Sequence, residues 1–138
     1  MIYVLASSST LNSDTLGNAY LSLDRPRSIE KQILWTSSVD KRDRFPKNLL
    51  TARYVVVADP NQFQGDLKDQ LDRMPVDYLL KGENIGTSYN KLPYVFNLQG
   101  GVKVYIYEKA RPFRQEDLDY ISSLFRARYP EWGDYRIS

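Results

Sequence analysis

The run Tyr54-Val55-Val56-Val57-Ala58-Asp59-Pro60 decides the fold of this chain. Its β-branched and apolar residues have no polar interruption before Asp59, a pattern typical of a strand that is covered on both faces. Such strands form the centre of α/β sheets, and ligands of open α/β sheets usually bind beyond the carboxyl ends of the strands. Asp59 lies at that end, so it is expected either to cap a turn ahead of Pro60 or to contact a ligand.

A cluster of alternating charges precedes this strand and consists of Asp40, Lys41, Arg42 and Asp43. Alternating signs are typical of a solvated loop with local ion pairs, each worth less than about 1 kcal/mol. The functional alternative is that Lys41 and Arg42 bind a phosphate or a carboxylate while Asp40 and Asp43 orient them. A catalytic acid pair would require Asp40, Asp43 or Asp59 to converge in space.

The chain begins with a second candidate for a central strand, Ile2 to Ala6. A polar turn comes next, and then Leu16, Ala19, Tyr20 and Leu23 recur at helical spacing. Asn12 and Ser13 are the expected caps of this helix. Strand, turn and helix in this order form the first half of a βαβ unit.

The turn between this strand and helix, residues 6–10, contains no glycine. Without glycine the backbone cannot approach a pyrophosphate closely, which argues against a classical site for NAD or S-adenosylmethionine. Serine hydroxyls and the first amides of the helix remain able to hold an anion, so Asn12 is a ligand-binding candidate beside its capping role.

The middle of the chain carries weaker patterns. They predict, in order, a strand over Ile29 to Trp35, a helical turn over Asn48 to Ala52, a loop over Asn61 to Asp69, a strand over Leu71 to Met74, a helix over Val76 to Leu80, and a turn bracketed by Gly82 and Gly86.

The end of the chain predicts an antiparallel hairpin and a helix. Residues 94–98 and 102–107 alternate on either side of Gly100-Gly101, and Leu118, Ile121 and Phe125 keep helical spacing until Pro130 stops the helix. Arg114 occupies the expected cap position, where Ser or Thr is preferred. Together the elements predict one α/β domain over residues 1–138, a three-layer sandwich with a Rossmann-like mixed sheet, a C-terminal antiparallel hairpin and a helix.

The composition excludes several classes of function. The 138 residues carry a net charge of +2, too weak to indicate a nucleic-acid partner. The chain lacks both His and Cys, which removes Ser-His-Asp, Cys-His and most zinc chemistry. We therefore expect no catalytic residues, no metal site and no cofactor. No apolar run approaches the eighteen or so residues that a membrane span needs.

Eleven tyrosines and two tryptophans are many for this length. Aromatic residues suit sugar faces and protein interfaces, but they are also ordinary in strands. Five of the tyrosines lie in predicted strands: Tyr3, Tyr54, Tyr94, Tyr105 and Tyr107.

Five groups of residues carry a resemblance to a known family: Tyr3-Val4-Leu5-Ala6-Ser7-Ser8 with Leu11-Asn12-Ser13-Asp14, Val39-Asp40-Lys41-Arg42-Asp43 with Phe45-Pro46, Tyr54-Val55-Val56-Val57-Ala58-Asp59-Pro60, Gly82 with Ile85-Gly86, and Gly101-Val102 with Tyr105-Ile106-Tyr107-Glu108-Lys109. In this order they resemble the C-terminal soluble domain of bacterial membrane glycosyltransferases, which are similar to the dolichyl-phosphate-mannose protein mannosyltransferase family.

This resemblance implies a domain from a larger membrane enzyme that takes sugar from a polyprenyl-phosphate donor on the extracytoplasmic side of the membrane. The carboxylate that such enzymes use lies in their membrane part, and no residue here corresponds to it. The domain is then a non-catalytic accessory module. Its expected partners are the transmembrane part of the parent enzyme and a saccharide, lipid-linked sugar or protein acceptor.

Two alternatives stay open. One is a free-standing Rossmann-like enzyme, with Asp40, Asp43 and Asp59 around a phosphorylated or sugar ligand. The other is a protein-interaction module that uses its tyrosines.

Overall fold

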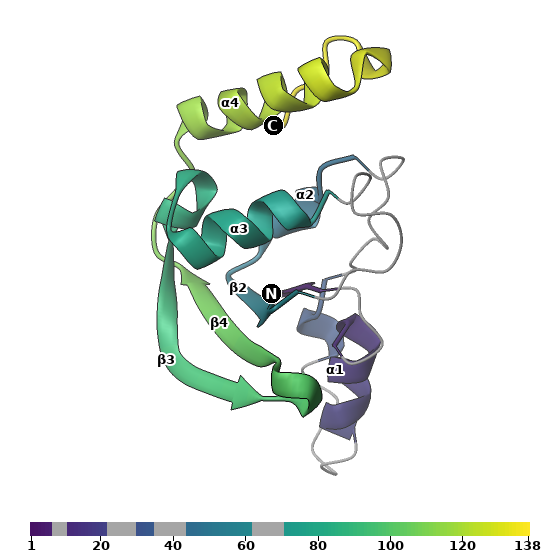
Figure 1. Cartoon of the computed structure of the whole chain (residues 1–138), viewed down its shortest axis with the longest axis vertical. Helices are drawn as coiled ribbons and strands as arrows, with labels where there is room; N and C mark the ends of the chain where they lie inside the picture. The colour runs from purple at the N-terminus through teal and green to yellow at the C-terminus, as the bar shows by residue number, and fades with distance from the viewer. Residues whose placement is uncertain (7–10, 22–29, 35–43, 62–70) are drawn as a thin grey trace.

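The computed structural model describes residues 1–6, 11–21, 30–34, 44–61 and 71–138. Figure 1 shows the arrangement of these segments. The elements are β1 (Ile2–Leu5), α1 (Ser13–Leu21), η1 (Glu30–Gln32), α2 (Lys47–Thr51), β2 (Tyr54–Asp59), α3 (Arg73–Lys81), η4 (Asn84–Ser88), β3 (Tyr89–Asn97), η5 (Gln99–Gly101), β4 (Lys103–Lys109), α4 (Gln115–Arg128) and η6 (Pro130–Trp132).

The chain is an α/β protein with a four-stranded mixed sheet in the order β1-β2-β4-β3. β1 and β2 are parallel, with Val4 opposite Val56. β4 is antiparallel to both of its neighbours, β2 and β3. The apolar run of β2 therefore occupies an interior position of the sheet, as its sequence predicts, and Val55 to Ala58 are buried.

Alternate residues of the strands feed two hydrophobic clusters, one on each face of the sheet. Val55 and Val57 belong to the larger cluster, with apolar residues from α2, α3, η4 and α4. Val56 and Ala58 belong to the smaller one, against which Leu16 of α1 packs. Helices therefore cover both faces, as Figure 1 shows with α1 apart from the other helices.

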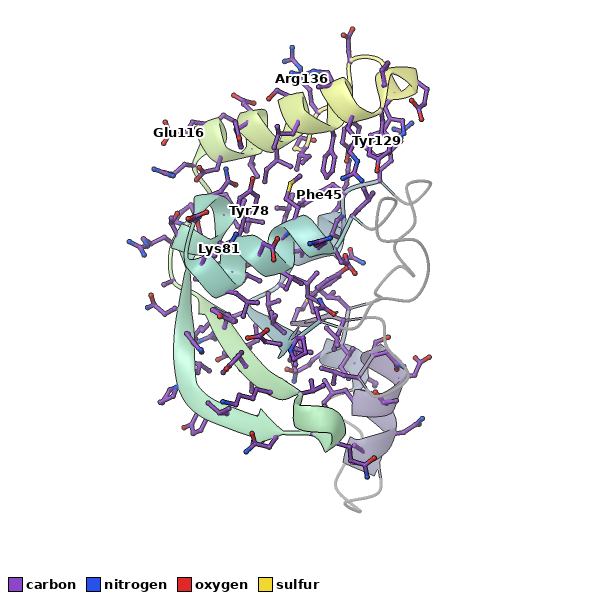
Figure 2. All side chains as sticks on the ribbon, in the orientation of Figure 1. Phe45, Tyr78, Lys81, Glu116, Tyr129 and Arg136 are labelled. Atoms are coloured by element: carbon purple, nitrogen blue, oxygen red, sulfur yellow. The ribbon has the colours of Figure 1, made fainter. Side chains whose placement is uncertain are left out.

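The terminal helix α4 lies outside α2 and α3, on their far side from the sheet (Figure 1). Aromatic rings fill the space below it: Phe45 lies 6.0 Å from Phe125 between ring centroids, and both are buried. Figure 2 shows Phe45 and Tyr78 between these layers.

The C-terminal tail returns beneath α4. The backbone N–H of Ile137 donates to the Ser122 hydroxyl (3.0 Å), and Arg126 donates to the Tyr135 carbonyl (2.9 Å). The buried Tyr135 hydroxyl accepts from the Phe45 backbone N–H (3.2 Å). These bonds tie the last residues of the chain to the aromatic cluster.

The predicted cap of the first helix is confirmed at Asn12. The backbone N–H of Thr15 donates to Asn12 Oδ1, and the backbone N–H of Asn12 donates to Thr15 Oγ1, both at 2.8 Å. This reciprocal pair has the geometry of a capping box, with Thr15 in the position that Glu or Gln usually holds.

Two predicted strands are wrong. In place of a strand from Ile29 to Trp35, the described part contains the 3-10 turn η1 and a single parallel bridge between Ile2 and Ile33. The described residues give a physical reason: Glu30, Lys31 and Gln32 of η1 are polar, and Ile33 and Leu34 after them pack against the two hydrophobic clusters.

The segment from Leu71 to Met74 is not a strand, because α3 begins within it at Arg73. Pro75 falls in the first turn of this helix, where its missing N–H has no intrahelical partner to lose. The helix ends at Gly82, which adopts φ +68°, a left-handed conformation that glycine allows without strain.

Five other predictions are confirmed: the first strand, the helical turn α2, the helix from Val76 to Leu80 within α3, the hairpin and the helix α4. The predicted loop from Asn61 to Asp69 lies outside the described residues after Asn61.

Candidate functional site

The carboxyl ends of the parallel strands β1 and β2 meet at one end of the sheet. Asp59 ends β2 there and is exposed. Leu11, just before the cap of α1, belongs to the smaller cluster with Ala6 and Ala58. The amino end of α1 therefore lies near the same end of the sheet. Asn12 and Asp59, two of the predicted site residues, are thus placed at one end of the sheet.

Asn61 also lies at this end of the sheet, and the sequence analysis did not identify it as a site residue. Its Nδ2 donates to the Leu5 carbonyl (3.4 Å), so the side chain links the ends of the two strands. Its Oδ1 is buried and accepts no hydrogen bond from the described atoms. Its position just after the end of a buried strand was the feature of the sequence that could have identified Asn61.

The charged residues Asp40, Lys41, Arg42 and Asp43 lie outside the described residues. Their convergence with Asp59 stays a prediction. In the β2–β4 register Asp59 lies opposite Lys103, which places a cation on the neighbouring strand.

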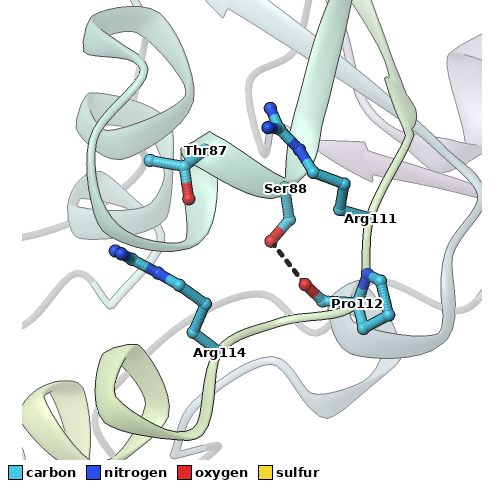
Figure 3. A pocket seen from close by; sticks show the side chains of 5 residues that line it. All are labelled: Thr87, Ser88, Arg111, Pro112 and Arg114. Carbon is cyan, nitrogen blue, oxygen red and sulfur yellow. Dashed lines mark hydrogen bonds between the residues drawn. The ribbon is translucent and has the colours of Figure 1, made fainter.

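A pocket of about 180 Å³ lies where α4 begins, lined by Thr87, Ser88, Arg111, Pro112 and Arg114 (Figure 3). Two guanidinium groups and two hydroxyls are a set of groups suited to an anion. The hydrogen bonds that the lining residues already make decide how many of these groups are free to bind an anion.

Most of the polar groups of this pocket are already engaged. Arg114 donates from Nε and Nη2 to the two oxygens of the buried Asp117 carboxylate, at 2.7 and 2.8 Å, and its Nη1 lies 3.0 Å from Glu116. This hydrogen bonding raises the pKa of Arg114 above its ordinary value. The Ser88 hydroxyl donates to the Pro112 carbonyl (3.1 Å).

The contacts of Ser88 join the end of η4 to the segment that precedes α4. The Ser88 carbonyl accepts two more bonds, from the backbone N–H groups of Ala110 and Arg111. As the cap position of α4, Arg114 makes no side-chain bond to the helix amides and is held through Asp117 instead. The pocket is a structural junction. The positive charge of Arg114 in it is offset by the carboxylates of Glu116 and Asp117.

The third candidate is the surface of the β3–β4 hairpin. β3 is an edge strand, and it forms an outer margin of the molecule in Figure 1. Three consecutive large apolar residues on it are about half exposed: Tyr94 (58%), Val95 (51%) and Phe96 (52%). We call these three residues the β3 strip. The only comparable side chains among the described residues are Met1 and Tyr120.

The sequence around the β3 strip is poor in acidic residues. The sequence has no Asp or Glu between Glu83 and Glu108, although acids make up 17 of the 138 residues. The two cations in that interval are Lys91 and Lys103. The Lys91 ammonium lies 3.5 Å from the centroid of the Tyr105 ring, so a cation–π contact holds it beside β4.

Two tyrosines of the hairpin, Tyr89 and Tyr107, are buried in the larger hydrophobic cluster and have structural roles. The Tyr89 hydroxyl donates to the Leu49 carbonyl (3.2 Å), and burial raises the pKa of Tyr89 well above its ordinary range. Burial also raises the pKa of Tyr107. Lys109 donates to the Leu50 carbonyl (2.8 Å), and partial burial lowers its pKa.

The described segments lack two features that would indicate particular classes of function. None of their helices is both long and apolar enough to cross a membrane. Within the same segments, no three His, Cys, Asp or Glu side chains gather in a way that would hold a metal ion.

No family model matches the sequence, and neither a curated protein nor a solved structure matches the chain.

Proposed function

We propose that this chain is a non-catalytic accessory domain of a membrane glycosyltransferase that uses a polyprenyl-phosphate sugar. It lies on the extracytoplasmic side, contacts the transmembrane part of its parent enzyme, and helps to bind or position the saccharide, lipid-linked sugar or protein acceptor. The parent enzyme and the side of the membrane are taken from the resemblance. The observation that carries the accessory role is the exposed β3 strip.

The β3 strip supports a contact role because three consecutive large apolar residues are about half exposed there. Monomeric domains rarely expose large contiguous apolar patches, and those that they do expose often mark binding surfaces. Tyr94 and Phe96 also belong to the residue types that are enriched at interfaces. The sequence has no His or Cys that would add a nucleophile or base nearby.

The alternative of a free-standing enzyme rests on the other end of the sheet. Asp59 and Asn61 lie together beyond the carboxyl ends of β1 and β2, where ligands of such sheets bind. This enzyme would need Asp40 and Asp43 to join them. The third possibility, a protein-interaction module, would use the same β3 strip with a different occupant.

We also propose that the architecture is a Rossmann-like three-layer sandwich with α4 added outside it. The parallel pair β1 and β2, with α1 between them in the chain and on the opposite face from α2 and α3, supports this arrangement. A parallel pair joined through a helix is the unit from which such folds are built.

The direct experiment is fractionation of the cells that make this sequence. An antibody raised against the 138-residue chain should detect a product much larger than 16.1 kDa. The product should stay in the membrane pellet after alkaline carbonate extraction. A product of about the size of the chain itself, found in the supernatant, would contradict the proposal and favour the free-standing enzyme.

A further inference from the structure

We propose that the β3–β4 hairpin rests edge-on against the surface of an anionic phospholipid bilayer. Tyr94 and Phe96 enter the interfacial region, while Lys91 and Lys103 face the headgroup phosphates. The inference rests on the proposed function, because it names the surface beside which the accessory domain lies. Its test uses the chain alone and gives an answer independent of the parent enzyme.

The exposed residues of the hairpin are of the types that suit a bilayer surface. Aromatic side chains with an apolar body and a polar end are enriched at the boundary between lipid and water. Lysines keep their ammonium groups at the headgroups while their stems lie along apolar surface. The hairpin presents both kinds of side chain: Tyr94 and Phe96 are half exposed on β3, and Lys91 and Lys103 are exposed.

The charge of the hairpin is complementary to an anionic surface. Between residues 84 and 107 the sequence has two cations and no carboxylate, while the register places Asp59 of β2 opposite Lys103, and Glu108, which pairs with Arg53, opposite Asn90. A carboxylate there would be repelled by an anionic membrane. Each lysine near such a surface strengthens binding by about fivefold.

The edge of the sheet presents apolar side chains from both of its faces. Phe96 and Val95 leave β3 on opposite faces, because they lie opposite Val104 and Tyr105. These two partners pack against different hydrophobic clusters. A flat surface that approaches the edge therefore meets apolar side chains from both faces at once.

The same edge is poorly suited to pairing with another strand. The register with β4 shifts between Lys91 and Val95, so the backbone is irregular there. Pro93 lies within this break and has no N–H to donate. Such devices are typical of edges protected against strand pairing. A partner that uses the side chains, rather than the backbone, fits this edge better than a second copy of the chain.

The test is binding of the purified chain to vesicles of phosphatidylcholine, with and without phosphatidylglycerol, measured by co-sedimentation. Wild type should bind the anionic vesicles at least about tenfold more strongly than the neutral ones. Tyr94→Ser/Phe96→Ser should reduce binding to anionic vesicles by at least about tenfold. Tyr120→Ser, which removes an equally exposed tyrosine from α4, should bind as wild type does.

Two matched double variants test how much the lysine charges contribute to vesicle binding. Lys91→Gln/Lys103→Gln should lose about tenfold or more of the binding to anionic vesicles. Arg73→Gln/Lys81→Gln removes the same charge from exposed positions of α3 and should change binding by less than about threefold. Equal losses in the two pairs would show that only net charge matters and would overturn the proposal.

Depth of insertion gives a second readout. Phe96→Trp should gain fluorescence quenching by brominated lipids, whereas Tyr120→Trp should not. The proposal is overturned if the hairpin variants bind vesicles as wild type does. It is also overturned if sedimentation shows a dimer that Tyr94→Ser/Phe96→Ser dissociates, because the β3 strip would then belong to a second copy. Vesicle binding by a chain that cells make as a small soluble product would contradict the proposed function and leave this inference intact.

Discussion

Gly86 packs directly against the backbone carbonyl of Tyr78, so that a Cβ at residue 86 would lie 2.0 Å from that oxygen. The contact joins η4 to α3, whose end is fixed by Gly82 and by the N–H of Glu83, which donates to the Tyr78 carbonyl (3.0 Å). The close approach holds Ile85 in the larger hydrophobic cluster.

The first prediction concerns this contact. Gly86→Ala should destabilise the protein by about 3 kcal/mol or more, because backbone must move to admit the methyl group. Chemical denaturation monitored by circular dichroism measures the loss. Gly82→Ala is the control: its φ is positive but its Cβ would meet nothing within 4 Å, so about 1–2 kcal/mol is expected. Equal losses for the two variants would contradict the close packing of η4 on α3.

The second prediction concerns the central strand. Val56 is buried in the smaller cluster and lies between Val4 and Ile106 on the neighbouring strands. Val56→Asp should lose on the order of 4 kcal/mol or unfold the protein, because it buries a charge that has no partner. Thr51→Asp, at an exposed position of α2, should change stability little. An unchanged melting temperature for Val56→Asp would show that the sheet order is wrong.

The third prediction is a loss of stability at alkaline pH. Burial raises the pKa of Tyr78, Tyr89, Tyr107 and Tyr135 above the ordinary value of 10.0. Above pH 10 the unfolded chain therefore loses tyrosine protons that the folded chain still holds, so the free energy of unfolding falls as pH rises. The lowered pKa of Lys109 acts in the opposite direction, but it is a single group.

Denaturation series from pH 8 to pH 12 measure this dependence. Tyr89→Phe should be less stable at pH 8, because it loses the hydrogen bond to Leu49, but its stability should fall less steeply above pH 10. Tyr94→Phe removes an exposed hydroxyl and should keep the wild-type slope. A flat profile to pH 12 for the wild type would be incompatible with these buried tyrosines.

The sequence predicted the elements whose patterns are local. The run of β2, the alternation of the hairpin and the spacing of α4 each decide their structure without help from distant residues. Leu71 to Met74 carry no such period, and α3 begins among them because the residues after Pro75 continue the helix. The outer position of α4 depends on the long-range contact between Phe45 and Phe125, which no local pattern reveals.

The candidate site was predicted less well. Asn12 was expected as a cap and is one, and Asp59 lies at the predicted strand end. The hairpin was predicted, but the exposure of Tyr94, Val95 and Phe96 on its edge strand was not. Pro93 and the missing acids were the available signals of that edge.

The fourth prediction is that the isolated chain has no glycosyl transfer or hydrolase activity. The reason is the resemblance, which places the carboxylate used for this chemistry in the membrane part of the parent enzyme and not in this chain. Assays with a polyprenyl-phosphate sugar and with a nucleotide sugar should give the rate of the buffer alone. Turnover that disappears in Asp59→Ala would contradict the accessory role and identify the strand end as an active site.

Photo-crosslinking in cells tests most directly whether the β3 strip is the contact surface of this domain. A benzophenone amino acid replaces Phe96 in one gene product and Tyr120 in the other, at side chains of equal exposure on different elements. We expect adducts with phospholipid or with the transmembrane part of the parent enzyme from position 96, and few from position 120. Adducts from position 120 with none from position 96, at matched expression, would show that the domain makes its contacts through another surface.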